Sequence, residues 1–146
     1  MGVMDEIDSL RERLETATPS ADGVADTLEV AWEVFDLLLT TCRACEDRSA
    51  ELFAAFSFAS AAAAQGRHLL WGAPSLPLAS VGRSRHVVSV VDDLEGIADA
   101  LAGLAQVMSG RLSSAARDAP DPGDRGACAD AAREAGQIYQ LLKRDR

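Results

Sequence analysis

The sequence predicts an all-α fold, a mostly antiparallel four-helix bundle, and three observations favour it. Residues 24–65 contain no proline and no glycine, and their apolar side chains recur at steps of three and four residues, as on the buried face of a helix. Residues 87–108 repeat that spacing. Aromatic residues make up only 5% of the chain, so we expect the core to form by close packing of helix on helix.

The length of 146 residues suits one domain with a buried core. We therefore expect residues 1–146 to form a single helical-bundle domain. The predicted helices span about 3–15, 24–65, 85–117 and 124–143.

The segment 24–65 is predicted to be one long central helix of about 40 residues, or roughly 60 Å. Its apolar positions are Leu28, Trp32, Phe35, Leu39, Cys42, Phe53, Phe56 and Ala63. The two positions that fall between Cys42 and Phe53 in this repeat, Glu46 and Ser49, are polar. A kink near Cys45–Ser49 is the alternative, but no proline, glycine or capping box indicates one.

The other helices are shorter. The apolar residues of the N-terminal helix are Val3, Ile7, Leu10 and Leu14. Acidic residues at 92, 93 and 95 suit the first turns of the third helix, because the N-terminal end of a helix dipole favours negative charge. Asp124 is expected to cap the last helix. Since the helix lengths differ, part of the central helix is expected to remain uncovered in a monomer.

The connection 67–84 follows Gly66, which is expected to end the central helix. It contains two prolines and two glycines, yet it also carries Leu69, Leu70 and Trp71. Long loops in compact domains are uncommon and are often functional. We expect Trp71 to anchor a partner or to close the end of the bundle.

The formal charge of −9 argues against a nucleic-acid partner, because phosphate contacts require a basic surface. Charge is unevenly distributed: residues 52–91 contain no acid and three arginines. The longest uncharged stretch, 52–66, is shorter than the ~20 residues that span a bilayer, so no membrane segment is expected. Three cysteines form no disulfide framework, which favours a cytoplasmic location.

Catalytic and metal-binding motifs are missing from the sequence, so we expect no enzyme activity, no metal and no cofactor. Cys42 and Cys45 form a CxxC pair, but a structural zinc site needs four ligands, and buried free thiols are the simpler interpretation. His68 and His86 bracket the connection, each beside an arginine, where they could bind an anion or a metal.

Two functions remain open from the sequence. The first is a non-catalytic interaction or adaptor protein that forms a homodimer or binds a helical protein partner. Its interface would contain Phe53, Phe56, Leu69, Leu70 and Trp71. The second is a small-molecule-binding bundle with a pocket near Trp32, Phe56 and Trp71, to which His68 or His86 would contribute.

Overall fold

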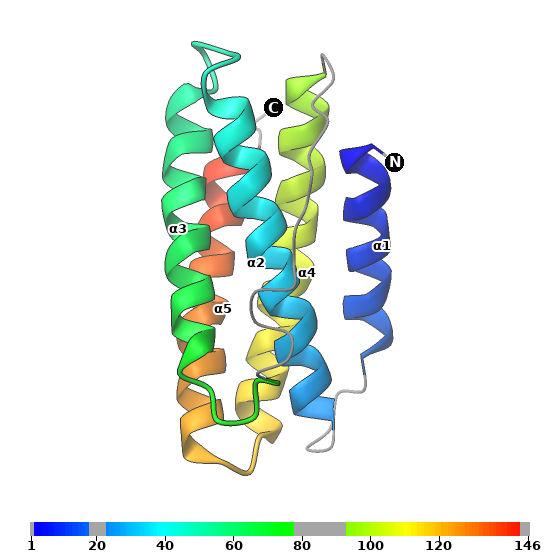
Figure 1. The fold of residues 1–146 in the computed structure, drawn as a ribbon, viewed down its shortest axis with the longest axis vertical. Coiled ribbons are helices and arrows are strands. Elements are labelled where there is room, and N and C mark those ends of the chain that lie inside the picture. Colours follow the sequence, from blue (N-terminus) through cyan, green and yellow to red (C-terminus); the bar gives the residue numbers. More distant parts are fainter. Residues whose placement is uncertain (1, 18–22, 78–92, 144–146) are drawn as a thin grey trace.

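The computed structural model describes residues 2–17, 23–77 and 93–143, and within these ranges the chain forms five helices and no strand. The helices are α1 (Val3–Thr16), α2 (Val24–Glu46), α3 (Phe53–Trp71), α4 (Leu94–Asp118) and α5 (Pro122–Leu142) (Figure 1). The all-α class predicted from the sequence is confirmed. None of these helices is both long enough and apolar enough to cross a membrane.

The five helices lie side by side along the long axis of the molecule (Figure 1). In that view α2 and α5 run upward, whereas α1, α3 and α4 run downward. Helix α3 packs against α2 and α5, and α4 packs against α5, α1 and α2. Helix α3 therefore lies at one edge of the bundle and α1 at the other.

The prediction of a single helix over 24–65 is wrong. The chain leaves α2 after Glu46, turns through 47–52 and returns alongside α2 as α3. The turn is held by a hydrogen bond from Arg48 N to Cys45 O (3.0 Å) and by one from Leu52 N to Ser49 Oγ (3.2 Å). Folding back buries the apolar sides of both halves against each other, whereas a 60 Å rod would leave much of that surface in water.

Two further boundaries differ from the prediction. Helix α3 continues through Gly66 to Trp71, so the beginning of the predicted connection is helical. Helix α4 begins at Leu94, where Asp93 Oδ1 accepts a hydrogen bond from Gly96 N (2.9 Å). The predicted earlier start at residue 85 lies outside the described residues, as does the part of the connection after residue 77.

Helix α5 is capped by Asp121 rather than by Asp124. Asp121 Oδ1 accepts hydrogen bonds from Gly123 N (2.7 Å) and Asp124 N (3.3 Å), and Pro122 occupies the first turn. Asp124 is buried instead, with 1% of its surface exposed. Its carboxylate accepts from Ser75 N (2.9 Å) and from Ser75 Oγ (2.5 Å), which ties the segment after α3 to the start of α5.

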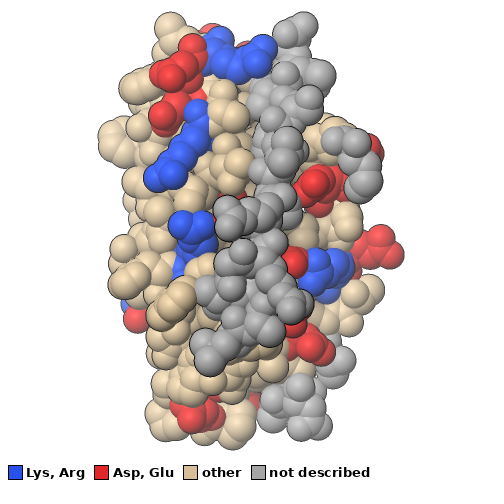
Figure 2. All heavy atoms as spheres, in the orientation of Figure 1, with Lys and Arg blue, Asp and Glu red and all other residues tan. Residues whose placement is uncertain are grey.

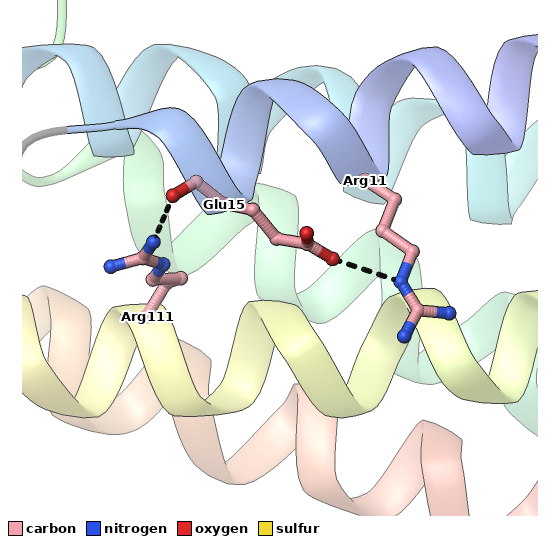
Figure 3. A network of polar contacts seen from close by, with 3 residues as sticks. All are labelled: Arg11, Glu15 and Arg111. Atoms are coloured by element: carbon pink, nitrogen blue, oxygen red, sulfur yellow. Dashed lines mark hydrogen bonds and ion pairs between the residues drawn. The ribbon is translucent and has the colours of Figure 1, made fainter.

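The core receives apolar side chains from all five helices. The predicted apolar stripe of the N-terminal helix is buried in full, at Val3, Ile7, Leu10 and Leu14. Polar contacts also hold the end of α1: Arg11 Nε donates to Glu15 Oε1 (3.0 Å), and Arg111 of α4 donates to the backbone oxygen of Glu15 (Figure 3).

Candidate interaction surface

The side of α3 that faces away from the bundle carries large apolar residues in solvent. We call it the outer α3 face and define it by the exposed residues of that helix: Phe53, Ala54, Phe58, Ala61, Gln65, His68 and Trp71. Phe53, Phe58 and Trp71 are 47%, 62% and 59% exposed. Only one other large hydrophobic residue among the described residues is exposed, Met4 of α1 at 42%. Exposed apolar side chains are thus concentrated on one helix.

The outer α3 face is also nearly free of charge. No charged residue lies between Glu51, just before α3, and Arg67 in its last turns. Figure 2 shows the left flank of the molecule, where α3 lies in Figure 1, with few charged side chains. In a chain with 23 acidic and 14 basic residues, an uncharged exposed face over four helical turns is unusual. Large exposed apolar residues gathered on one uncharged helix face favour a binding site in a soluble protein.

The inner face of α3 fixes the position of the outer one. Ala59, Ala63 and Gly66 are buried, and these small residues let α2 come close. A Cβ added at Gly66 would lie 2.7 Å from Cδ1 of Phe35 and closer still to Cε1 and Cζ, so the Phe35 ring occupies the space of the missing side chain. Gly66 therefore serves the contact between α2 and α3, and it does not end the helix as predicted.

Trp71, in the last turn of α3, contacts Trp32 of α2. The ring centroids are 5.8 Å apart with the planes at 50°. Trp32 is buried, and the guanidinium of Arg67 lies 5.6 Å from its ring centroid. Arg67 Nη1 also donates to Asp36 Oδ1 at 2.7 Å, an ion pair that is largely shielded from solvent. This cluster holds the Trp71 ring in place while more than half of that residue stays exposed.

The structure separates the predicted interface residues into two groups. Phe53 and Trp71 are exposed on α3, and Leu69 is half-buried. Phe56 and Leu70 are completely buried in the core, so they are unavailable to a partner. The sequence interpretation places both on the surface because it treats 67–71 as loop and leaves part of helix 24–65 uncovered, whereas α3 runs to Trp71 and packs against α2 and α5.

Phe58 is the surface residue that the sequence interpretation missed. It belongs to the set Ala54, Phe58, Ala61, Gln65 and His68, which also steps 4-3-4-3 along the helix. The apolar repeat through Phe53 and Phe56 is the stronger pattern in this segment, because the second stripe also contains glutamine and histidine. Phe58 is the one large apolar residue in this second stripe, and its presence there was the sign in the sequence of an exposed apolar residue.

The predicted aromatic pocket does not form as one site. Trp32 and Trp71 are in contact, but Phe56 lies fifteen residues before Trp71 on the same helix, or about 22 Å away along its axis. Phe56 instead borders a hollow of about 200 Å³ together with Leu52, Ala98 and Leu142. His68 is exposed on α3, and His86 lies outside the described residues.

The cysteines are buried free thiols. Burial raises the pKa of Cys42, Cys45 and Cys128, and for Cys128, which also lies near Asp124, the pKa is raised to about 11. A thiol that stays protonated is a poor nucleophile and a poor metal ligand. Across the described part of the chain, no three His, Cys, Asp or Glu residues are grouped in a way that could hold a metal ion.

Comparisons with protein-family models, with curated proteins and with solved structures found no match.

Proposed function

We propose that this protein is a non-catalytic interaction protein that binds a helical protein surface through its outer α3 face. The observation that carries the proposal is the exposure of Phe53, Phe58 and Trp71 on a helix without charged residues before Arg67. Aromatic side chains bury much apolar area at little entropic cost, and tryptophan is enriched among the residues that dominate binding energy.

The geometry of the face suits a helix as its partner. Phe58 stands between the small residues Ala54 and Ala61 along this face, so its ring projects with a hollow before and after it. A projecting side chain of this kind inserts into a hole between side chains of a facing helix. Trp71 adds a large ring at the end of the stripe, held by Trp32 and therefore already in place before binding.

The cellular setting is part of the proposal. Three buried free thiols and no disulfide among the described residues suit a reducing compartment, so we place the protein in the cytoplasm. The acidic charge of −9 supports a protein partner over a nucleic acid.

Site-specific photocrosslinking in the native cells tests this function. A photoreactive phenylalanine analogue replaces Phe58, and the control places the same analogue at Met4, the exposed residue of α1. Both sites are exposed, so both variants should fold. We expect polypeptide adducts from position 58 and few from position 4. Absence of any polypeptide adduct at position 58 would overturn the proposal.

The small-molecule alternative has support from the Trp32–Trp71 contact alone, since Phe56 lies at the other end of α3. A ligand beside the two rings would alter tryptophan fluorescence, and Trp71→Phe would remove most of that response. A saturable fluorescence change with a cell-extract fraction of low molecular mass would favour this alternative over the interaction function.

A further inference from the structure

We infer that the partner of the outer α3 face is the same face of a second copy of this chain, packed so that the two α3 helices run antiparallel. The inference rests on the proposed function and names its partner. Three features carry it: the spacing of the exposed residues, the sizes of the side chains brought opposite one another, and the charges at the two ends of α3.

The first four residues of the exposed stripe are symmetric in their spacing about the midpoint between Phe58 and Ala61. Ala54, Phe58, Ala61 and Gln65 follow one another at steps of 4, 3 and 4 residues. Such a stripe remains on one side of a helix and forms a seam with a second helix. In a two-fold dimer each contact occurs twice, with residue i meeting j and j meeting i. A two-fold axis at that midpoint pairs these four residues with one another in both copies.

The side chains that this axis brings together are complementary in size. Phe58 of each copy lies opposite Ala61 of the other, and Ala54 lies opposite Gln65, so large residues meet small ones. Large and small side chains in alternation are what interlocking helix surfaces require.

The charges at the ends of α3 decide the orientation and favour a second copy. Glu51 is exposed before the helix, whereas the basic groups Arg67 and His68 lie in its last turns. Antiparallel packing brings Glu51 of one copy near the basic end of the other. Parallel packing would place the two Glu51 carboxylates, and the two exposed Asp47 carboxylates, against each other.

The net charge of the chain also favours contact between two copies through the outer α3 face. Each chain carries −9, so two copies repel each other over most approaches. The outer α3 face is the stretch where that repulsion is smallest, because residues 52–66 carry no charge.

Sedimentation velocity over a range of concentrations tests self-association. We expect a dimer that Phe58→Asp weakens by at least about 30-fold in Kd, the effect of losing one central contact residue, and more because the contact occurs twice. Met4→Asp adds the same charge at an exposed residue of α1 and should leave the Kd unchanged. A dimer that withstands Phe58→Asp would contradict the inference.

Disulfide trapping tests the orientation. Ala54→Cys and Gln65→Cys alone should not form an intermolecular disulfide on mild oxidation. A mixture of the Ala54→Cys and Gln65→Cys proteins should cross-link, because those positions face each other only in the antiparallel arrangement. The native thiols are buried and do not compete. Efficient cross-linking of Ala54→Cys with itself would overturn the antiparallel geometry.

The two proposals fail in different ways. A wild-type protein that remains monomeric up to about 100 µM, well above the Kd of ordinary specific complexes, refutes the second-copy inference. If position 58 nevertheless gives adducts with another polypeptide in cells, the interaction function stands with a different partner. If position 58 gives no polypeptide adduct either, both proposals are wrong.

Discussion

Gly66 of α3 lies directly against the ring of Phe35 in α2, with no room for a side chain between them. This contact sets how closely the two helices approach, and both residues are fully inside the protein. It also explains how a glycine can lie in the middle of a helix, where it costs up to ~1 kcal/mol relative to alanine. The cost is offset by complete burial of the Phe35 ring.

Gly66→Ala should destabilise the protein. A methyl group there overlaps the Phe35 ring, and overpacking of a core costs about 1–3 kcal/mol, of which the better helix propensity of alanine returns up to ~1. We expect a net loss of about 1–2 kcal/mol in the free energy of unfolding, measured by urea denaturation. Gly110→Ala is the matched control in α4, because nothing lies within 4 Å of its added Cβ, and it should stabilise the protein slightly. Equal effects of the two substitutions would show that α2 and α3 are not packed as described.

Asp124→Ala should destabilise the protein more than Asp121→Ala. The first change removes a buried carboxylate and leaves Ser75 N without its acceptor, which costs about 2–3 kcal/mol. The second removes an exposed helix cap, worth about 1 kcal/mol. Ser75→Ala, which loses only one of the two bonds to Asp124, should fall near the smaller value. Chemical denaturation of the three variants gives the order, and a reversed order for the two aspartates would contradict the roles assigned to them.

Thr41→Val should stabilise the protein. Thr41 is fully buried in α2, and its hydroxyl is without a hydrogen-bond partner in the described structure. Valine has nearly the same shape and removes the unsatisfied group, so the free energy of unfolding should rise by about 1 kcal/mol. Thr27→Val is the comparison. Thr27 is a buried threonine of the same helix, and its hydroxyl is not among the buried groups that have no hydrogen-bond partner. A loss of stability on Thr41→Val would mean that the hydroxyl has a partner in solution.

Stability should fall with rising pH above about 9 because of the buried thiols. Burial raises the pKa of Cys128 to about 11, from 9.0 for an exposed cysteine. Between these pH values the unfolded chain releases the Cys128 proton and the folded chain keeps it. The contribution of this thiol to the free energy of unfolding is therefore complete below pH 9 and is lost as the pH rises toward 11. Cys128 alone contributes a slope of up to about 1.4 kcal/mol per pH unit.

Cys128→Ala is the variant that isolates this effect. Its stability should decline less steeply than that of the wild type between pH 9 and 11, although the smaller side chain lowers the stability at pH 7. Denaturation curves of both proteins at each pH give the difference. Parallel pH profiles would indicate that Cys128 ionises as readily in the folded state as in the unfolded one.

The sequence was sufficient for the helical class and for α1 and α5, but not for the division of residues 24–71 into two helices. The stripe Val3, Ile7, Leu10 and Leu14 placed α1 correctly, because apolar spacing reports directly which side of a helix is buried. The turn at 47–52 was missed because it contains neither proline nor glycine and is closed by Ser49 and backbone hydrogen bonds. The polar residues at 46 and 49, which interrupted the apolar repeat, were its one local sign.

The surface was harder to predict than the core. Spacing alone cannot tell which apolar stripe of α3 is covered, since Phe56 and Phe58 are equally apolar and lie two positions apart. Only the return of α3 beside α2 and α5 decides that Phe56 is buried and Phe58 exposed. Similarly, the contact between Trp32 and Trp71 depends on a turn that brings residues 39 positions apart together, which no local pattern reports.

Native mass spectrometry of the wild type and of Phe58→Asp, each purified gently from its native cells, tests the central claim most directly. The claim is that the outer α3 face binds protein. It predicts the mass of a dimer or of a protein complex for the wild type, and the mass of the single chain for Phe58→Asp. A wild-type protein found as the single chain, or a complex that survives the substitution unchanged, would contradict it.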